Sequence, residues 1–325
     1  MKREDVINLF LKEKILLSPT ILDFITQQTN IEDFIDKLKK FCLERNIFFI
    51  DENVLNEFSI FIKKDEKDES FFEIKLEKPE ELVEFTTEDI SLLLRKRFDF
   101  LSTLITQNNQ LTDVFSISKI VGSRKTSERV KVIGIVKDKT TYTFTLEDHT
   151  GYMVVFGEVN DIEKINIDEV IGVEVQKVDD KFKLIKIYYP SFTFFREIKK
   201  IQDDFFISNF LVKVKDRELK IEVKDGLKLD VGGVKVFLLN FDFISFYLKN
   251  KPIENLTLLL EKRHLNPTII KDKKIYKDDF FLLKEIPDYL VVLNSPINEK
   301  KIYKGVQIFL LSRNSMVNLK NGSIV

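Results

Sequence analysis

The sequence is poor in the residues that build covalent cross-links and metal sites. It contains one cysteine, two histidines and no tryptophan, and its 325 residues include no alanine. The single thiol of Cys42 can form neither an internal disulfide nor a thiolate metal site, and its apolar helical context predicts a buried, inert group. A chain with this cysteine content fits a reducing compartment, so we expect a cytoplasmic protein.

The scarcity of histidine limits the catalysis that the chain can support. Two-metal hydrolytic sites commonly use several imidazoles, and only His149 and His264 are present. We expect His149 in a turn and His264 at a helix end, where structural or interface roles suffice. There is no Gly-x-Ser-x-Gly elbow, and Gly232–Gly233 is expected to form a hairpin turn rather than a phosphate loop. The carboxylate pairs Asp203–Asp204 and Asp278–Asp279 are predicted to be solvated. We therefore predict no catalytic residue, metal or cofactor.

The overall charge does not direct the chain to a polyanion or to a membrane. Lys and Arg total 52 against 53 Asp and Glu, so the net charge is −1. No apolar run approaches the ~18 residues of a membrane span, and we expect no membrane partner. The charge is uneven, however. Residues 112–190 carry 12 basic and 13 acidic side chains, whereas residues 191–325 carry 24 and 17, a net charge of +7.

Hydrophobic periodicity predicts helices in the first third of the chain. Residues 1–58 are predicted to form a helical N-terminal domain, in which Ser18-Pro19 marks one helix start. A second helix there places its apolar side chains on one face: Ile31, Phe34, Ile35, Leu38 and Phe41. Residues 59–85 are predicted to be a charged linker with a short strand near 71–76. Residues 86–111 are predicted to form one long helix that starts near Thr87.

From residue 112 to 190 the apolar spacing changes to two, which predicts strands. The candidates are residues 115–121, 130–136, 142–146, 152–156, 170–178 and 182–188, with a polar, helix-compatible stretch near 158–168. An oligonucleotide/oligosaccharide-binding (OB) barrel typically has five short strands and such a helix, so we predict this fold for the segment.

Aromatic residues of this barrel are candidates for nucleic-acid binding. Stacked aromatics on such a sheet hold the bases of single strands, and the candidates are Tyr142, Phe144, Tyr152 and Phe156. The competing interpretation is that alternate members fill the barrel core. The segment is slightly acidic, which disfavours backbone neutralisation, so we expect any DNA contact here to be weak.

The last segment, residues 191–325, mixes predicted strands at 219–223, 234–239, 289–293 and 306–311 with a helix at 253–263. The aromatic run at residues 188–195, on the boundary with the barrel, must be covered by this segment or by another protein. Together with the basic end of the predicted helix, this run supplies our partner-interface candidates: Tyr188, Tyr189, Phe192, Phe194, Phe195, Lys262, Arg263 and His264.

Several motifs occur in an order that resembles one known family. They are Arg97–Leu101, Val132–Val136 with Leu146–Gly151, Asp168–Val173, the Tyr188-Tyr189-Pro190 exit, Leu259–Pro267, Ile286–Asp288 and Tyr303–Val306. This order resembles the small (B-type) subunit of archaeal family-D DNA polymerase. The resemblance implies an α+β multidomain chain with a helical N-terminal domain, an OB-fold barrel over 112–190 and a calcineurin-like phosphoesterase domain over 191–325. It also implies a large catalytic polymerase subunit as partner.

The departures from that family imply a truncated, inactive phosphoesterase-like α/β domain. Active members need five histidines, and none of the ten glycines here is followed by Asp, Asn or His. Where the resemblance places the last metal loop, this chain has Asn294–Ile297, and Asn240-Phe241 occupies the preceding His-Gly position. Our hypothesis is a non-catalytic scaffold subunit that docks to the large subunit and has lost its exonuclease. The alternatives are a stand-alone OB-fold single-stranded DNA-binding protein and a residual nuclease with an unrecognised carboxylate site.

Overall fold

The structure is a computed structural model that describes most of the chain. The described residues are 3–26, 31–45, 47–55, 57–58, 74–122, 128–179, 181–192, 203–215, 217–269 and 274–325. The chain divides into two compact units, Met1–Phe72 and Glu73–Val325. No helix in these ranges combines the length and the apolar character needed to cross a membrane.

The first unit is helical, as the periodicity predicts. It contains α1 (Arg3–Leu11), α2 (Pro19–Thr26) and α3 (Ile31–Glu44), with a two-stranded parallel sheet of β1 (Leu16–Leu17) and β2 (Phe49–Ile50). The Ser18 hydroxyl accepts a hydrogen bond from the Ile21 amide at 3.4 Å, so the predicted start of α2 is confirmed. Cys42 is fully buried in the core of this unit, and burial raises the pKa of its thiol to about 11, as expected of an inert cysteine.

The second unit begins with a strand and a long helix. β3 (Ile74–Glu77) overlaps the short strand predicted near 71–76 within the linker, and it pairs with β12 (Gly226–Val231) of the C-terminal sheet; residues 71–73 lie outside the described residues. α5 (Thr87–Asn108) confirms the predicted helix and starts with a capping box, in which Thr86 and Asp89 exchange hydrogen bonds. Its buried positions are Arg97, Leu101 and Ile105, which lie on one face at spacings of four.

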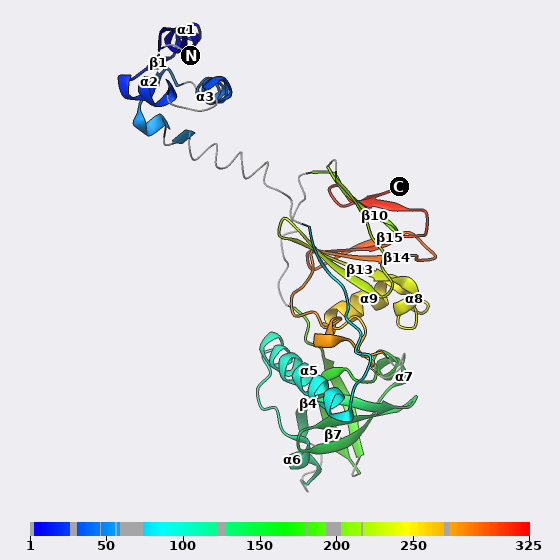
Figure 1. Ribbon diagram of the computed structural model, residues 1–325. Coiled ribbons are helices and arrows are strands. Elements are labelled where there is room, and N and C mark those ends of the chain that lie inside the picture. The colour runs from blue at the N-terminus through cyan, green and yellow to red at the C-terminus, as the bar shows by residue number, and fades with distance from the viewer. Residues whose placement is uncertain are drawn as a thin grey trace. The chain divides into compact units, whose positions relative to one another are not determined.

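Five strands close into a barrel, as predicted. They are β4 (Arg129–Lys139), β5 (Thr143–Asp148), β6 (Gly151–Phe156), β7 (Val170–Val178) and β8 (Lys181–Tyr188), in the order β4-β5-β6-β8-β7. β4 pairs with β7, and β6 pairs in parallel with β8, which closes the sheet. The predicted short helix is α7 (Val159–Ile162), between β6 and β7. α5 packs against β4 and β7 (Figure 1).

One predicted strand of this segment is wrong. The alternating run at 115–121 contains the helix α6 (Ile117–Val121) instead. Its buried side chains, Ile117 and Ile120, are three residues apart, which suits one helical face, and the Ile117 amide donates to the Asp148 carboxylate at 2.8 Å. That hydrogen bond joins α6 to the β5–β6 turn, which contains His149 as predicted, with its side chain exposed.

The C-terminal region contains two sheets. A six-stranded sheet has the order β15-β16-β14-β13-β12-β3, and a five-stranded sheet has the order β11-β10-β9-β17-β18. Their further strands are β9 (Phe205–Ser208), β10 (Leu211–Val214), β11 (Arg217–Lys220), β12 (Gly226–Val231), β13 (Val234–Asn240), β14 (Tyr289–Leu293), β15 (Glu299–Tyr303), β16 (Val306–Leu310), β17 (Met316–Asn318) and β18 (Ser323–Ile324). The mixed α and β composition that we expected is therefore observed.

Helices cover one face of the six-stranded sheet. α8 (Phe241–Ile244) and α9 (Pro252–Glu261) contact β13, β15 and β16 (Figure 1). The predicted strands at 234–239, 289–293 and 306–311 and the helix at 253–263 are confirmed, and the strand predicted at 219–223 overlaps β11 only in part. Gly232 and Gly233 join β12 to β13 with φ of 58° and 82°, which confirms the predicted hairpin turn.

Gly134 on β4 provides a test of barrel packing. A Cβ atom there would lie 2.8 Å from the Glu147 backbone oxygen and 2.5 Å from Leu146 Cγ, so Gly134→Ala requires the β4–β5 pair to move apart. We expect a loss of about 1–3 kcal/mol in unfolding free energy, measured by urea denaturation. Gly151→Ala is the matched control, because its Cβ would meet nothing closer than 4.0 Å. Equal stabilities of the two variants would contradict the close approach.

Candidate functional site

The structure separates the four aromatic candidates of the barrel. Tyr142 and Tyr152 are 63% and 66% exposed, so both rings are available on the outside of the barrel. Phe144 is buried in the barrel core, which is the competing interpretation given above for alternate members, and Phe156 is partly buried. Only the two tyrosines therefore present most of their rings to solvent.

The aromatic run that ends the barrel faces inward where the structure describes it. Tyr188 and Phe192 are buried, and the Tyr188 hydroxyl donates to Glu174 at 3.0 Å. The Tyr189 hydroxyl is also buried, and burial, followed by the charge of Glu169, raises the pKa of Tyr189. Phe192 packs in the core under the six-stranded sheet. The described members of the run are thus covered by this chain itself. Phe194 and Phe195 lie outside the described residues.

The basic cluster at the end of α9 is also internal. Lys262, Arg263 and His264 are all buried, so they do not form the exposed docking surface that we predicted. The Lys262 ammonium lies 2.7 Å from the Glu169 carboxylate, and both side chains are 2% exposed. The Arg263 guanidinium lies over the Phe192 ring, 5.5 Å from its centre. These cations find their partners within the chain because the barrel and the C-terminal region meet at this helix end.

Arg97 of α5 is the central side chain of this junction. It is 1% exposed and donates two parallel hydrogen bonds to the Asp279 carboxylate, at 2.8 and 2.9 Å. Its remaining terminal nitrogen donates to the backbone oxygens of Asp168 and Pro267, at 2.9 and 2.6 Å. One buried guanidinium therefore joins α5, the barrel and the C-terminal region.

His264 completes the same cluster. Its Nε2 lies 2.9 Å from the Asp279 carboxylate, while its Nδ1 accepts a hydrogen bond from the Asn266 amide at 3.2 Å. A ring that accepts at Nδ1 and donates at Nε2 is neutral. Consistently, burial, and after it the Arg97 charge, lower the pKa of His264, although Asp279 acts in the opposite direction.

Asp279 departs from its predicted solvated state. Burial alone would raise the pKa of this carboxyl, but the charge of Arg97 and the contact with His264 hold it well below the usual range. Asp278 beside it is exposed, as predicted. Sequence reasoning missed Asp168, Glu169 and Asp279 as partners of the basic residues. Asp168 and Asp279 have positive φ values, 64° and 52°, but these backbone angles cannot be read from the sequence.

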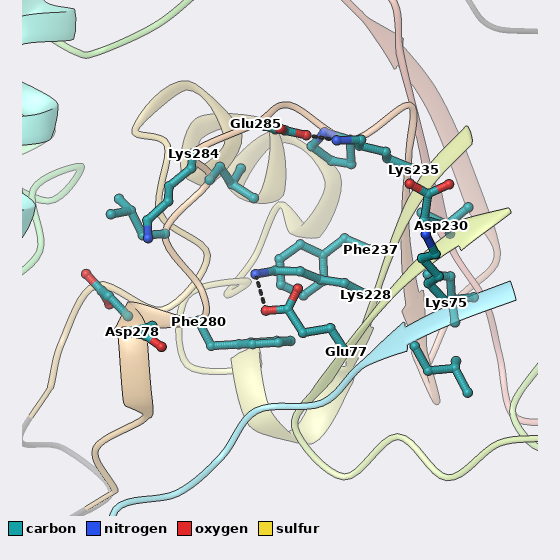
Figure 2. A pocket seen from close by; sticks show the side chains of 17 residues that line it. Lys75, Glu77, Lys228, Asp230, Lys235, Phe237, Asp278, Phe280, Lys284 and Glu285 are labelled. Atoms are coloured by element: carbon teal, nitrogen blue, oxygen red, sulfur yellow. Dashed lines mark hydrogen bonds and ion pairs between the residues drawn. The ribbon is translucent and has the colours of Figure 1, made fainter. Parts of the chain in front are cut away.

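A cavity on the six-stranded sheet contains charged side chains that are paired with one another. It has a volume of about 480 Å³ and contains charges of both signs (Figure 2). The Lys228 ammonium lies 4.1 Å from the centre of the Phe280 ring and 3.2 Å from the Glu77 carboxylate, and Lys235 pairs with Glu285. In the described ranges, no group of three or more His, Cys, Asp or Glu side chains is placed to hold a metal ion. We therefore do not place the functional site in this cavity.

Removal of the Arg97 charge tests the junction. Arg97→Met leaves the Asp279 carboxylate buried without its main partner, so we expect a loss of about 3–5 kcal/mol in unfolding free energy. The double variant Arg97→Met/Asp279→Leu should be less destabilised, because both charges are removed. Lys213→Met in the exposed Lys213–Glu218 pair is the control and should cost at most about 1 kcal/mol. A loss at Arg97 no larger than this control would contradict the role of the junction.

The neutral state of His264 makes stability depend on pH. The unfolded chain takes up a proton near pH 6.5, whereas the folded chain resists it because its His264 pKa is lowered. The contribution of His264 to the free energy of unfolding is therefore fully present above pH 6.5. It decreases as the pH falls below this value, by about 1 kcal/mol between pH 7.5 and 5.5. Thermal unfolding across this range should show the loss in the wild type and in exposed-site His149→Gln, but not in His264→Gln. Parallel pH profiles for all three proteins would refute this assignment.

Comparisons with known proteins find similarity to solved structures over about a quarter of this chain. No family model matches the chain, and no curated protein matches it. Among solved structures, the telomere capping protein Ten1 from Saccharomyces pombe is similar with a TM-score of 0.20 and 17% identity, over 24% of this chain and 79% of that chain. A chain of the S. pombe Stn1–Ten1 complex has a TM-score of 0.20 and 16% identity, over 24% and 74%. The hypothetical protein ygiW from E. coli has a TM-score of 0.20 and 13% identity, over 23% and 88%. At these TM-scores, the similarities carry no argument about what this chain does.

Proposed function

We propose that this chain is a non-catalytic small subunit of a family-D-type replicative DNA polymerase, which holds and orients a separate, large catalytic subunit. In this proposal the five-stranded barrel is an OB fold, and the two-sheet C-terminal region is a shortened phosphoesterase domain. The polymerase active site belongs to the partner chain. The proposal rests on the resemblance of the motifs, and the following contacts support it.

The observation that carries the proposal is the convergence of three motif segments. Arg97, Asp168 and Pro267 belong to three separate stretches that resemble the family, and the Arg97 guanidinium bonds to the backbone oxygens of the other two. His264, in the Arg-His-Leu stretch, reaches the same Asp279 carboxylate as Arg97. Motifs that maintain one interdomain junction would be retained in a scaffold even after catalysis is lost.

The ends of two parallel strands support the loss of catalysis. Asn240 ends β13, Asn294 directly follows β14, and Asn240 pairs with Leu293 across these strands. Ligands of open α/β sheets bind beyond the carboxyl ends of such strands, and the resemblance places metal loops there. The Asn240 side chain instead caps α8 by accepting from the Asp242 amide and donates to the Val223 backbone oxygen. An amide with these backbone contacts is a poor substitute for imidazole or carboxylate ligands.

Purification from the native cell tests the proposal. A tagged copy of the full chain should co-purify with a much larger chain, which mass spectrometry identifies as a DNA polymerase and which synthesises DNA in the eluate. This chain alone should release no nucleotides from a 3′ end, with or without Mn²⁺. Recovery of a stable, unaccompanied monomer would overturn the subunit assignment, and chelator-sensitive nucleotide release would instead favour the residual nuclease.

One observation favours a second candidate function, single-stranded DNA binding by the barrel. Tyr142 and Tyr152 expose most of their rings, and exposed aromatics on such barrels stack on bases. Tight binding of a single strand by the purified chain at physiological salt, abolished by Tyr142→Ala/Tyr152→Ala, would favour this candidate over the scaffold.

A further inference from the structure

A basic cleft lies between the barrel and the segment formed by the α8–α9 loop and α9. It consists of two adjoining cavities of about 820 and 520 Å³, which share Lys139, Asn166 and Phe246 in their walls. One wall comes from β4 and from the segment that follows α7, and the other comes from residues 246–262. In Figure 1, α7 lies at the side of the barrel nearer to α8 and α9. All of these elements belong to the same compact unit.

Lysines dominate the charge of this cleft. Its walls include two carboxylates, Glu163 and Asp168, against six lysines from different parts of the chain: Lys137, Lys139, Lys164, Lys249, Lys251 and Lys262. The whole chain has a net charge of −1, so this density of positive charge is local. It also includes lysines of the barrel, whose overall composition is slightly acidic.

Three of the six lysines are paired with carboxylates. Lys262 pairs with Glu169, Lys137 lies 3.0 Å from Glu147, and Lys164 lies 2.9 Å from Asp161. The last two pairs are exposed, and such pairs exchange readily for other anions because they contribute little stability.

The other three lysines have no carboxylate at ion-pair distance among the described residues. Lys139 is half-buried and donates to the backbone oxygens of Ile162 and Ile165. Burial lowers the pKa of Lys139, the charges of Glu169 and Glu163 raise it, and the nearby ammonium groups of Lys262 and Lys249 lower it. Lys249 and Lys251 are exposed at the opposite wall. Like charges that a fold brings together repel one another, and a bound polyanion relieves this repulsion.

The cleft also contains groups that suit nucleotides. Phe246 lines both cavities and is 45% exposed to solvent, and the Lys249 ammonium lies 4.5 Å from the centre of its ring. A ring so placed offers a stacking surface for a base beside a cation for its phosphate. Four asparagines supply further hydrogen-bonding groups: Asn160, Asn166, Asn250 and Asn255. The exposed Tyr142 lies in the β4–β5 loop, which begins directly after Lys139.

We propose that this cleft binds the backbone of single-stranded nucleic acid, with phosphates at Lys164, Lys249 and Lys251, Lys139 at the floor and a base stacked on Phe246. A single strand fits better than a duplex because only an unpaired base presents its face to the ring. The site is distinct from the outer face of β6, where Tyr152 lies. It does not depend on the polymerase assignment, because its evidence is the charge and shape of the cleft.

Salt-dependent binding by the full chain tests the site. The probe is a fluorescein-labelled oligothymidylate of about 20 nucleotides, followed by anisotropy from about 0.05 to 0.2 M salt. Lys164→Gln/Lys249→Gln/Lys251→Gln should weaken binding about 100-fold at about 0.1 M salt and reduce the slope of log K against log salt by about 2. Phe246→Leu should weaken single-strand binding about tenfold and leave duplex binding unchanged.

A matched variant separates this site from general charge effects. Lys119→Gln/Lys220→Gln/Lys320→Gln removes three exposed lysines outside the cleft and should bind like the wild type. Equal loss in the two triple variants, retained binding in the cleft variant, or no binding by the wild type at the lowest salt would each overturn the proposal. Displacement of the probe by poly-glutamate as readily as by unlabelled DNA would show a site for acidic protein segments instead. None of these outcomes depends on whether a large polymerase chain co-purifies.

Discussion

The bonds of the Arg97 guanidinium hold the second compact unit of this protein together. A buried cation is costly unless its donors are satisfied, and here the acceptors come from the barrel, from the segment after α9 and from Asp279. The relative positions of α5, the barrel and the C-terminal region must therefore satisfy all of these bonds together. The Lys262–Glu169 pair adds a second buried tie between α9 and the barrel. The cleft between the barrel and the α8–α9 loop with α9 is formed by elements whose positions depend on these two contacts.

The cations of this unit fall into two groups with different consequences. Arg97 and Lys262 are buried and compensated by carboxylates, so their charge is used for architecture and is not available to a ligand. Lys249 and Lys251 are exposed, and in the described part of the chain they stand near other lysines without a carboxylate to pair with. This distinction explains how a protein with no excess of positive charge can present a surface for a polyanion. The proposed phosphate contacts at Lys164, Lys249 and Lys251 are therefore made by side chains other than the buried ones, although Lys262 lies in a wall of the same cleft.

Local periodicity predicted most of the regular structure because many elements alternate burial along their own sequence. The helix at Thr87–Asn108 buries residues four apart, and the barrel strands β5, β6 and β8 alternate over most of their length. The run at 115–121 misled because its apolar residues fit a period of two, whereas the buried pair Ile117 and Ile120 fits a helix. Strands such as β11 and β15 were missed or misplaced because they are short and rich in charged residues, so little of their pattern is apolar. Of the barrel aromatics, the tyrosines lie outside and Phe144 lies inside, as alternation along a strand allows but does not specify in advance.

The amino-acid sequence by itself determined the chemical inventory and the local turns. One thiol and two imidazoles limit the ligands that the chain can offer, and Gly232–Gly233 supplies the positive φ values that its hairpin needs. The tertiary structure alone decided that Lys262, Arg263 and His264 face inward and that Asp279 is not solvated. The physical reason is that their environment comes from residues far along the chain: Arg97 and Asp279 are 182 residues apart, and Lys262 and Glu169 are 93 apart. Pairing over such separations depends on how the domains pack, and no local pattern of charge or hydrophobicity encodes it.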